Sequence, residues 1–289
     1  MPIPDRKTSP TSLPDLSWLT TDDGSRSLIN KATGVSYHSG CGAVSEALVV
    51  YLLNSGVARR LADGLETKVF ELGFGTGMNM LLTAAMAERC QTKVELVAVE
   101  NRLLPANIFR EVNLSSSLVA LDQCWPSQSL TTDLIEESFE LVEMVEKRWL
   151  HWLDNFIDDE GKATAGQQEV SLDEAPRVVE VVLGEYSALR LHLMAWSDFL
   201  RLSVQKPTAS MQGVFQAVYF DPFCPETSPE LWQESVFRAM AEMLEAGGRL
   251  ASYCVKGEIR RRIQSLGFEI DKQPGPIGGK REVLVARNK

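Results

Sequence analysis

The chain is best understood from one stretch, Lys68-Val-Phe-Glu-Leu-Gly-Phe-Gly-Thr-Gly-Met-Asn79. It begins as a short apolar strand, turns through three glycines at alternate positions and ends in the first residues of a helix. Glycine allows backbone angles that are closed to other residues, and its missing side chain lets a ligand lie directly on peptide groups. The stretch therefore predicts a strand, a ligand-binding turn and a helix in succession.

The charge around this turn indicates the kind of ligand. The spacing is G-x-G-x-G rather than the G-x-G-x-x-G of dinucleotide folds, and there is no Lys or Arg between Val69 and Glu88. A pyrophosphate needs nearby positive charge, whereas a carboxylate at the strand end suits an ammonium and a sulfonium. We interpret the stretch as the cofactor motif of an S-adenosylmethionine-dependent methyltransferase; a glycine turn without a ligand is the alternative. The cofactor-binding residues predicted here are Glu71, Gly73, Phe74, Gly75, Gly77 and Asn79.

From Lys68 onward, predicted strands and helices alternate. The strands are expected at 68–72, 94–99, 177–183, 214–220, 247–254, 267–271 and 281–286, and the helices at 77–89, 105–113, 229–245 and 256–265. This alternation predicts an α/β protein of the Rossmann-like class I methyltransferase type, with a seven-stranded, mostly parallel sheet and helices on both faces. Ligands are expected at the carboxyl ends of the strands. The last strand follows its neighbour so closely that we expect the two to pair antiparallel.

Two segments fall outside this alternation. Residues 1–35 are rich in Pro, Ser, Thr and Asp and predict a flexible leader, which leaves 36–289 as the methyltransferase domain. Between about 114 and 176 the alternation breaks, and a helix expected at 134–157 indicates a helical insertion. The inserted helix either packs on the body of the domain or covers the substrate as a lid, and the sequence leaves both possibilities open.

Acidic residues follow the next two predicted strands. Glu100 ends the second strand, twenty-three residues after Gly77, where its two oxygens can accept hydrogen bonds from ribose hydroxyls. Gly184 and Glu185 follow the predicted third strand, and Glu185 is expected to receive the adenine amino group. A solvent-exposed loop position is the alternative for both glutamates.

The fourth predicted strand leads into Asp221-Pro-Phe-Cys-Pro225. The two prolines restrict the turn and hold Asp221 and Phe223 where the methyl donor is expected. An alkyl amine has a pKa of roughly 10 and is no nucleophile while protonated, so a carboxylate that accepts its proton assists the reaction. We therefore predict methylation of nitrogen, with Asp221 as the catalytic residue and Phe223 against a base or a cation of the substrate. The alternative for Asp221 is a helix cap or turn former.

Charge is distributed unevenly along the chain. The formal net charge is −10, yet residues 249–289 hold ten Lys or Arg against four Asp or Glu. Any nucleic-acid surface is therefore expected in this tail. Within it, Lys280 and Arg281 follow two glycines and are predicted to hold a phosphate of the substrate.

Cysteine and histidine positions argue against a metal site. The five cysteines are scattered, and the three histidines share no metal-ligand spacing with one another or with the cysteines. We expect neither a metal nor a disulfide, and a reducing compartment. The longest apolar run, residues 47–53, is too short to span a membrane, and the N-terminus has no apolar signal region. A soluble, cytoplasmic protein without membrane association is predicted.

The sequence resembles one family, the methyltransferase part of the MnmC-type tRNA-modifying enzymes. The matching pieces are Glu71 to Asn79, Asp221-Pro-Phe-Cys-Pro-Glu-Thr-Ser-Pro-Glu-Leu-Trp232, Gly247 to Tyr253, Arg261-Arg262 before Leu266-Gly-Phe268, and Gly279-Lys-Arg-Glu282, and the stretch from Tyr37 to Glu46 is similar to the N-terminal signature of the family. The resemblance covers about residues 36–287, interrupted by the 114–176 segment.

This resemblance implies methyl transfer from S-adenosylmethionine to the primary amine of 5-aminomethyl-(2-thio)uridine at the wobble position of tRNA, with Asp221 nearest the reacting nitrogen. The family commonly carries Asp where Glu185 stands, and smaller residues where Pro222 and Cys224 stand. Bifunctional members continue into a flavin oxidase domain. We therefore expect a methyltransferase-only protein without flavin, with the aminomethyl group supplied by a separate enzyme. The alternatives are methylation of another amine, in a small molecule or a nucleic-acid base, and a cofactor-binding or RNA-binding scaffold without catalysis.

Overall fold

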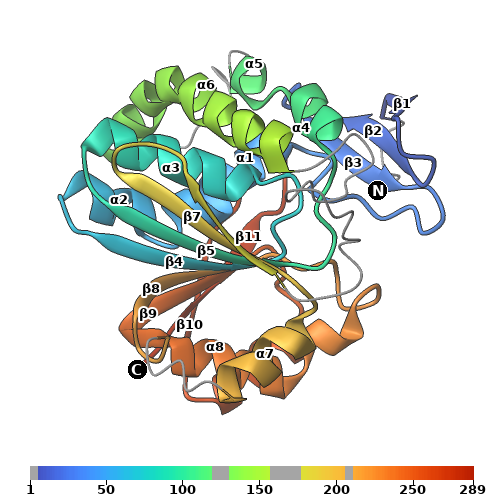
Figure 1. Ribbon diagram of the computed structural model, residues 1–289. Coiled ribbons are helices and arrows are strands. Elements are labelled where there is room, and N and C mark those ends of the chain that lie inside the picture. The colour runs from blue at the N-terminus through green and yellow to red at the C-terminus, as the bar shows by residue number, and fades with distance from the viewer. Residues whose placement is uncertain (1–5, 119–129, 157–176, 206–210) are drawn as a thin grey trace.

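A computed structural model describes residues 6–118, 130–156, 177–205 and 211–289. Within these residues eight strands form one central sheet (Figure 1). Their order across the sheet is β10 (Glu269–Pro274), β11 (Glu282–Arg287), β9 (Leu244–Ser252), β8 (Phe215–Phe220), β4 (Thr67–Leu72), β5 (Val94–Glu100), β7 (Ser187–Leu193) and β6 (Arg177–Val182). The five strands from β9 to β7 run parallel, whereas β11 and β6 are antiparallel to their neighbours. The mostly parallel α/β sheet and the antiparallel last strand are confirmed.

The prediction of seven strands is wrong because it omits β7. The segment 187–193 pairs with β5 as a parallel strand, while the predicted third strand is β6, which pairs antiparallel at the edge of the sheet. The two are joined by a tight turn at residues 183–186. This changes which residues follow the third parallel strand.

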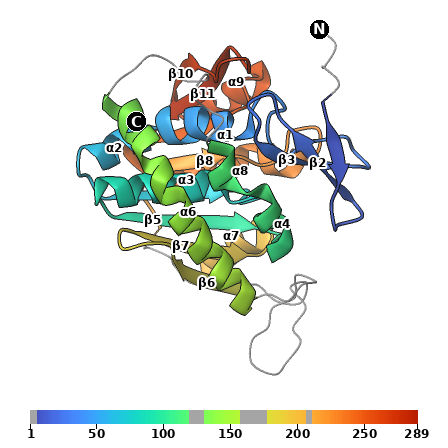
Figure 2. The same ribbon diagram turned by 90° about the horizontal axis from the view of Figure 1, so that it is seen from above.

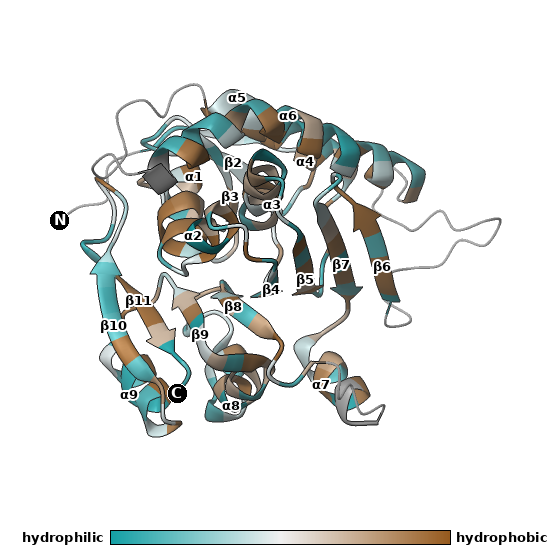
Figure 3. Cartoon of the chain, turned by 90° about the vertical axis from the view of Figure 1, so that its left-hand side faces the viewer, coloured by the Kyte–Doolittle hydropathy of each residue, from teal (hydrophilic) through white to brown (hydrophobic). Residues whose placement is uncertain are grey.

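Helices cover both faces of the sheet, as predicted (Figures 1 and 3). One face carries α1 (Ala43–Glu46), the π-helix η1 (Ala47–Leu53), α2 (Val57–Ala62), α3 (Met78–Cys90), α4 (Ala106–Val112), α5 (Leu114–Leu118) and α6 (Leu130–Phe156). The other carries α7 (Trp196–Gln205), the 3-10 helix η2 (Pro229–Trp232), α8 (Glu234–Met243) and α9 (Gly257–Ser265). Side chains alternate between the faces, so that Val69 packs in one apolar cluster and Phe70 in the other. Burial on both faces accounts for the nearly continuous apolar runs of the central strands.

The N-terminal segment forms a small antiparallel sheet of β1 (Thr8–Pro10), β2 (Leu16–Thr20) and β3 (Arg26–Asn30). Leu16, Trp18 and Leu28 are buried in the main apolar cluster, and the Trp18 indole donates a 2.7 Å hydrogen bond to Glu111. The prediction of a flexible leader over 1–35 is therefore wrong for residues 6–35. Composition averaged over the segment conceals two short strands whose alternate residues are apolar.

Asp23 joins this sheet to the domain that follows. Its carboxylate accepts five hydrogen bonds, from the Thr21 hydroxyl and from the amides and hydroxyls of Ser25 and Ser45. Burial acts to raise the pKa of Asp23, but these hydrogen bonds outweigh it and the net shift is downward. Ser45 lies in α1, so Asp23 satisfies one amide in the first turn of that helix.

Helix α6 packs on the body of the domain. It lies against α3 (Figure 2) and buries side chains at helical spacing: Ile135, Val142, Val145, Trp149 and Leu153. The packed alternative is therefore confirmed for the described part of the insertion, and the lid is not. Residues 119–129 and 157–176 lie outside the described residues. No helix in the described ranges combines the length and apolarity needed to cross a membrane.

Candidate active site

A cavity of about 540 Å³ lies at the carboxyl ends of β4, β5, β7 and β8. This edge of an open parallel sheet is where α/β proteins bind ligands. Each of the four strands contributes a lining segment: 72–75 after β4, 99–102 after β5, 194–197 after β7 and 221–223 after β8. The cavity therefore joins the predicted glycine turn, Glu100 and the Asp221 loop.

The glycine turn follows the predicted geometry. Gly73, Gly75 and Gly77 have φ angles of 93°, 53° and 72°, which favour glycine. A Cβ on Gly73 would lie 2.8 Å from the backbone oxygen of Asp221, and one on Gly77 would lie 2.7 Å from the Phe74 ring. Side chains at Gly73 and Gly77 would therefore collide with neighbouring parts of the chain, which accounts for glycine at these positions.

Glu100 is anchored beside the turn. Its Oε2 accepts the amide of Gly75 at 2.9 Å and its Oε1 accepts the amide of Arg102 at 2.8 Å. Burial raises the pKa of Glu100, while these backbone hydrogen bonds lower it. Glu100 also lines the cavity, so its side chain borders the space that a ligand would fill.

Asn79 links the two carboxylates of the predicted site. Its Nδ2 donates to Glu71 Oε1 at 2.7 Å and to Asp221 Oδ2 at 2.9 Å. The hydroxyl of Tyr51, on η1, donates to Asp221 Oδ1 at 2.5 Å. Both oxygens of Asp221 therefore have a donor, and the carboxylate has a defined orientation at the cavity.

The site is short of positive charge. Burial raises the pKa of Asp221 well above its ordinary value, and the Glu46 carboxyl raises it further. Burial likewise raises the pKa of Glu71, with a contribution from Asp221, and that of Glu46. Lys280 acts in the opposite direction on Asp221 and Glu46. A cationic ligand would stabilise the ionised form of these carboxyls.

Phe223 lies within the Asp221 loop, and Lys280 contacts Tyr253, whose hydroxyl donates to the backbone oxygen of Pro222 in that loop. The Phe223 ring lines the cavity and meets the Tyr37 ring edge-on, with centroids 5.0 Å apart. Lys280 Nζ donates to the Tyr253 backbone oxygen at 3.1 Å and lies 4.3 Å from the centroid of the Tyr253 ring. Arg281 is exposed next to it. The structure thus brings Lys280 near the predicted catalytic residue.

Gly184 and Glu185 are not brought to this site. They lie in the turn of the β6–β7 hairpin, at the edge of the sheet opposite the cavity (Figure 1). The Glu185 amide donates to the Glu88 carboxylate at 3.0 Å. This corrects the expectation that they follow the third parallel strand, because β6 runs antiparallel to β7.

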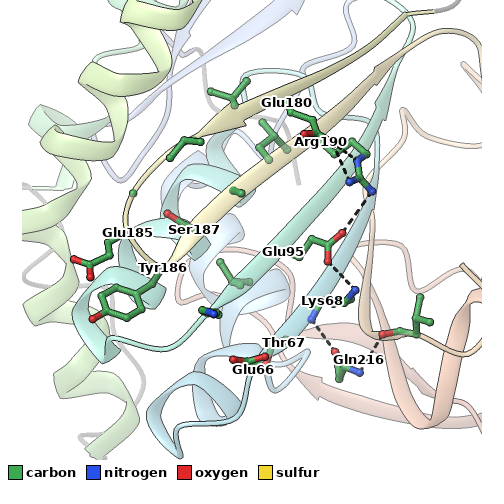
Figure 4. A pocket seen from close by; sticks show the side chains of 18 residues that line it. Glu66, Thr67, Lys68, Glu95, Glu180, Glu185, Tyr186, Ser187, Arg190 and Gln216 are labelled. Carbon is green, nitrogen blue, oxygen red and sulfur yellow. Dashed lines mark hydrogen bonds and ion pairs between the residues drawn. The ribbon is translucent and has the colours of Figure 1, made fainter. Parts of the chain in front are cut away.

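Both residues instead line a second cavity, of about 680 Å³, at the amino ends of β4, β5 and β7 (Figure 4). Across its floor runs a row of paired charges on neighbouring strands. Lys68 pairs with Glu95 at 2.7 Å, and Arg190 pairs with Glu180 at 2.9 Å and with Glu95 at 3.6 Å. These half-exposed charges neutralise one another, and none of the other predicted site residues is near.

Several residues at the site are not among those predicted from the sequence. Residues 194–197 line the cavity because they follow β7, and Asp198 comes next, in the first turn of α7. The sequence signal for β7 was present, because Leu189, Leu191 and Leu193 alternate with polar residues after the turn at Gly184. Tyr51 and Glu46 had no local signal pointing to Asp221. The N-terminal segment also contributes lining residues, namely Asn30, Tyr37 and His38.

The donor and acceptor set fits S-adenosylmethionine. Glu71 Oε2 and Asn79 Oδ1 are buried without a hydrogen-bond partner among the described residues, and buried acceptors of this kind need donors. An ammonium group would supply these hydrogen-bond donors, and a sulfonium would add positive charge beside the carboxyls. No group of three or more His, Cys, Asp or Glu in the described ranges is placed to hold a metal ion.

Comparisons with known proteins agree with this assignment. Residues 159–289 match a family model described as an S-adenosyl-L-methionine-dependent methyltransferase. The chain is 26% identical over 254 residues to the tRNA 5-methylaminomethyl-2-thiouridine biosynthesis bifunctional protein MnmC of Cupriavidus necator, covering 86% of this chain and 31% of that protein. It is 28% identical over 278 residues to the MnmC protein of Chromohalobacter salexigens, covering 94% of this chain and 32% of that protein. The chain thus spans about a third of the length of these relatives.

A solved structure shares the fold. The crystal structure of MNMC2 from Aquifex aeolicus superposes with a TM-score of 0.60 at 20% identity, covering 99% of this chain and 72% of that one. The resemblance to MnmC-type proteins is therefore confirmed, and the family match over residues 159–289 supports the predicted class of S-adenosylmethionine-dependent methyltransferase and its methyl donor.

Proposed function

We propose that the protein transfers a methyl group from S-adenosylmethionine to the primary amine of 5-aminomethyl-(2-thio)uridine at the wobble position of tRNA, which gives 5-methylaminomethyl-(2-thio)uridine. The observation that carries the proposal is the Asp221 carboxylate, held at the cavity by Tyr51 and Asn79 and disfavoured in its ionised form by burial and by Glu46. Such a site accommodates an alkylammonium group. The names of the MnmC relatives point to the tRNA base that carries it.

In this proposal the methyl donor lies across the carboxyl ends of the central strands. The glycine turn receives it, Glu71 and Asn79 take its ammonium end, and Glu100 takes its ribose hydroxyls. We assign the adenine to residues 194–197, with Asp198 beside them, in place of Gly184 and Glu185. The reason is geometrical, because 194–197 line the cavity and the hairpin turn does not.

The chain's own residues then prepare the amine. The bound donor supplies a methyl group on a sulfonium, which needs little further activation. The Asp221 carboxylate would take one proton from the substrate ammonium and leave the nitrogen with the lone pair that accepts the methyl group. The products are a methylammonium group and a neutral thioether. Alignment of nitrogen, methyl and sulfur accounts for most of the rate.

The RNA is proposed to approach from the side of Phe223, Lys280 and Arg281. In this proposal Phe223 stacks on the base, and Lys280 and Arg281 contact phosphates of the RNA backbone. A separate enzyme is proposed to supply the aminomethyl group. The protein would work in the cytoplasm, the compartment that holds the tRNA.

The test is methyl transfer with labelled S-adenosylmethionine and matched RNA substrates. We expect incorporation into tRNA that carries the 5-aminomethyl group and none into the same tRNA without it. Small alkyl amines and DNA, tested in parallel, separate the alternatives. Labelling of those compounds alone would indicate another amine substrate. Binding of the donor without labelling of any substrate would indicate a scaffold, and either result would overturn the proposal.

A further inference from the structure

Tyr51 stands out among the buried polar groups around the site. Its side chain is fully buried, with an exposed fraction of 0%, and its hydroxyl donates to Asp221 Oδ1 at 2.5 Å. The two residues are 170 positions apart in the chain. A tyrosine this deep in an apolar cluster would be replaceable by phenylalanine if only packing mattered.

The position of Tyr51 is fixed from several sides. It lies in η1, a π-helix of seven residues, and such helices are frequent at functional sites. Its ring meets that of Tyr219 with centroids 5.5 Å apart. The Tyr219 hydroxyl interacts instead with Thr83, at 3.1 Å. Two neighbouring buried phenols thus have different partners, and the hydroxyl of Tyr51 is the one aimed at the cavity edge.

We propose that Tyr51 is a positioning residue that orients the Asp221 carboxylate toward the substrate amine and favours its ionised form. The proposal rests on the proposed function, because Asp221 is the proton acceptor there. Tyr51 does not line the cavity and acts through Asp221 alone. A hydrogen bond from a hydroxyl favours the charged form of its acceptor, which makes proton transfer from the amine possible near neutral pH.

The surroundings make this hydrogen bond important. The Glu46 carboxyl, on α1, disfavours the ionisation of Asp221. Asp221 in turn raises the pKa of Glu71, on β4. Tyr253, after β9, is another acidic group near Asp221, and burial raises its pKa. Lys280, before β11, is the cation that acts on Asp221. Burial also raises the pKa of Tyr51 well above its ordinary value, so that its hydroxyl stays protonated and remains a donor.

The experiment compares Tyr51→Phe with the matched variant Tyr219→Phe, which removes the neighbouring buried hydroxyl but none from Asp221. In Tyr51→Phe we expect kcat to fall about 10- to 100-fold, and the acid limb of the kcat/KM profile to move upward by about 1 to 2 pH units. The Kd for S-adenosylmethionine should stay within about threefold of wild type. Tyr219→Phe should leave the acid limb in place, and an equal shift in both variants would overturn the proposal.

A second measurement needs no substrate. Protein labelled with ¹³Cγ-aspartate reports the titration of Asp221 by NMR, with Asp221→Asn assigning the resonance. An unchanged Asp221 titration in Tyr51→Phe would overturn this inference whether or not the protein methylates tRNA. A shifted titration in a protein that leaves aminomethyl-tRNA unmethylated would overturn the proposed function instead. Should Tyr51→Phe fail to fold, 3-fluorotyrosine at position 51 keeps the side chain and strengthens the donor, so the acid limb should move to lower pH, and no movement would refute the proposal.

Discussion

The side-chain amide of Asn79 lies 2.9 Å from Oδ2 of Asp221. One residue belongs to the helix after the glycine turn and the other to the proline-flanked loop after β8, 142 positions later. Strands β4 and β8 are neighbours in the sheet, so their carboxyl ends bring these two segments together. The cofactor motif and the predicted catalytic residue therefore form one site.

Asp221→Ala should separate binding from chemistry. We expect kcat to fall at least about 100-fold, as is typical when a proton acceptor is lost. The Kd for S-adenosylmethionine, measured by calorimetry, should change little because Gly73, Gly75 and Glu100 remain. Asp63→Ala, at an exposed helix end, is the control and should leave both quantities unchanged. Normal turnover of Asp221→Ala would refute the role given to Asp221.

Glu100→Gln and Glu185→Gln test the corrected position of the donor. Both remove one negative charge from a glutamate predicted to contact it, yet Glu100 lines the cavity and Glu185 lies at the opposite edge. We expect Glu100→Gln to weaken S-adenosylmethionine binding about tenfold, or about 1.4 kcal/mol, and Glu185→Gln to have no effect. Calorimetry on both variants decides it. Equal losses in both would reject the position assigned here.

Lys280→Ala combined with Arg281→Ala should weaken binding of tRNA. If each residue contacts a phosphate, the slope of log Kd against log salt should fall by about 1 to 2. The paired control is Lys68→Ala with Lys93→Ala, which removes the same charge from the opposite edge of the sheet. Filter binding from 50 to 200 mM salt provides the measurement. An unchanged slope in the first pair would remove these residues from the RNA surface.

Asp23→Asn should destabilise the fold by about 1 to 3 kcal/mol at neutral pH, because a buried carboxylate with five hydrogen bonds loses its charge. The folded-state pKa of Asp23 lies below its ordinary value of 3.8. Its contribution is therefore complete above the unfolded-state pKa and is lost as the pH falls through the folded-state pKa.

Urea unfolding at several pH values between 7 and 3 checks this prediction. The difference between wild type and Asp23→Asn should be constant down to about pH 5 and shrink below about pH 4. Asp22→Asn, which loses an exposed ion pair with Arg6, should cost less than about 1 kcal/mol. A difference that grows on acidification would contradict the account of Asp23.

The predictable part of the site is the part with local causes. The glycines of the turn adopt positive φ angles because they have no side chain, and the prolines beside Asp221 restrict one short loop. Glu100 was predictable because the second strand ends at it and its place in the sheet follows from the alternation of strand and helix. In each case the physical reason lies within about thirty residues.

The incorrect predictions concern segments whose neighbours are distant in the chain. A run of β-branched residues at 177–183 predicts a strand but not its direction. Because β6 pairs antiparallel to β7, Gly184 and Glu185 lie at the amino end of β7, on the side of the sheet opposite the cavity. The N-terminal strands have a loop-like composition, and their order comes from burial of Leu16, Trp18 and Leu28 against the main core.

By itself the sequence determined the fold class, the cofactor motif and the identity of the acid at the end of β8, because backbone freedom, side-chain alternation and turn chemistry act over short distances. Only the tertiary structure decided which residues surround that acid. The hydroxyl of Tyr51 and the carboxyl of Glu46 reach Asp221 through the packing of helices on the sheet. Hydrogen bonds and charges act through space, so two partners that are remote in the chain produce no periodic pattern in the sequence.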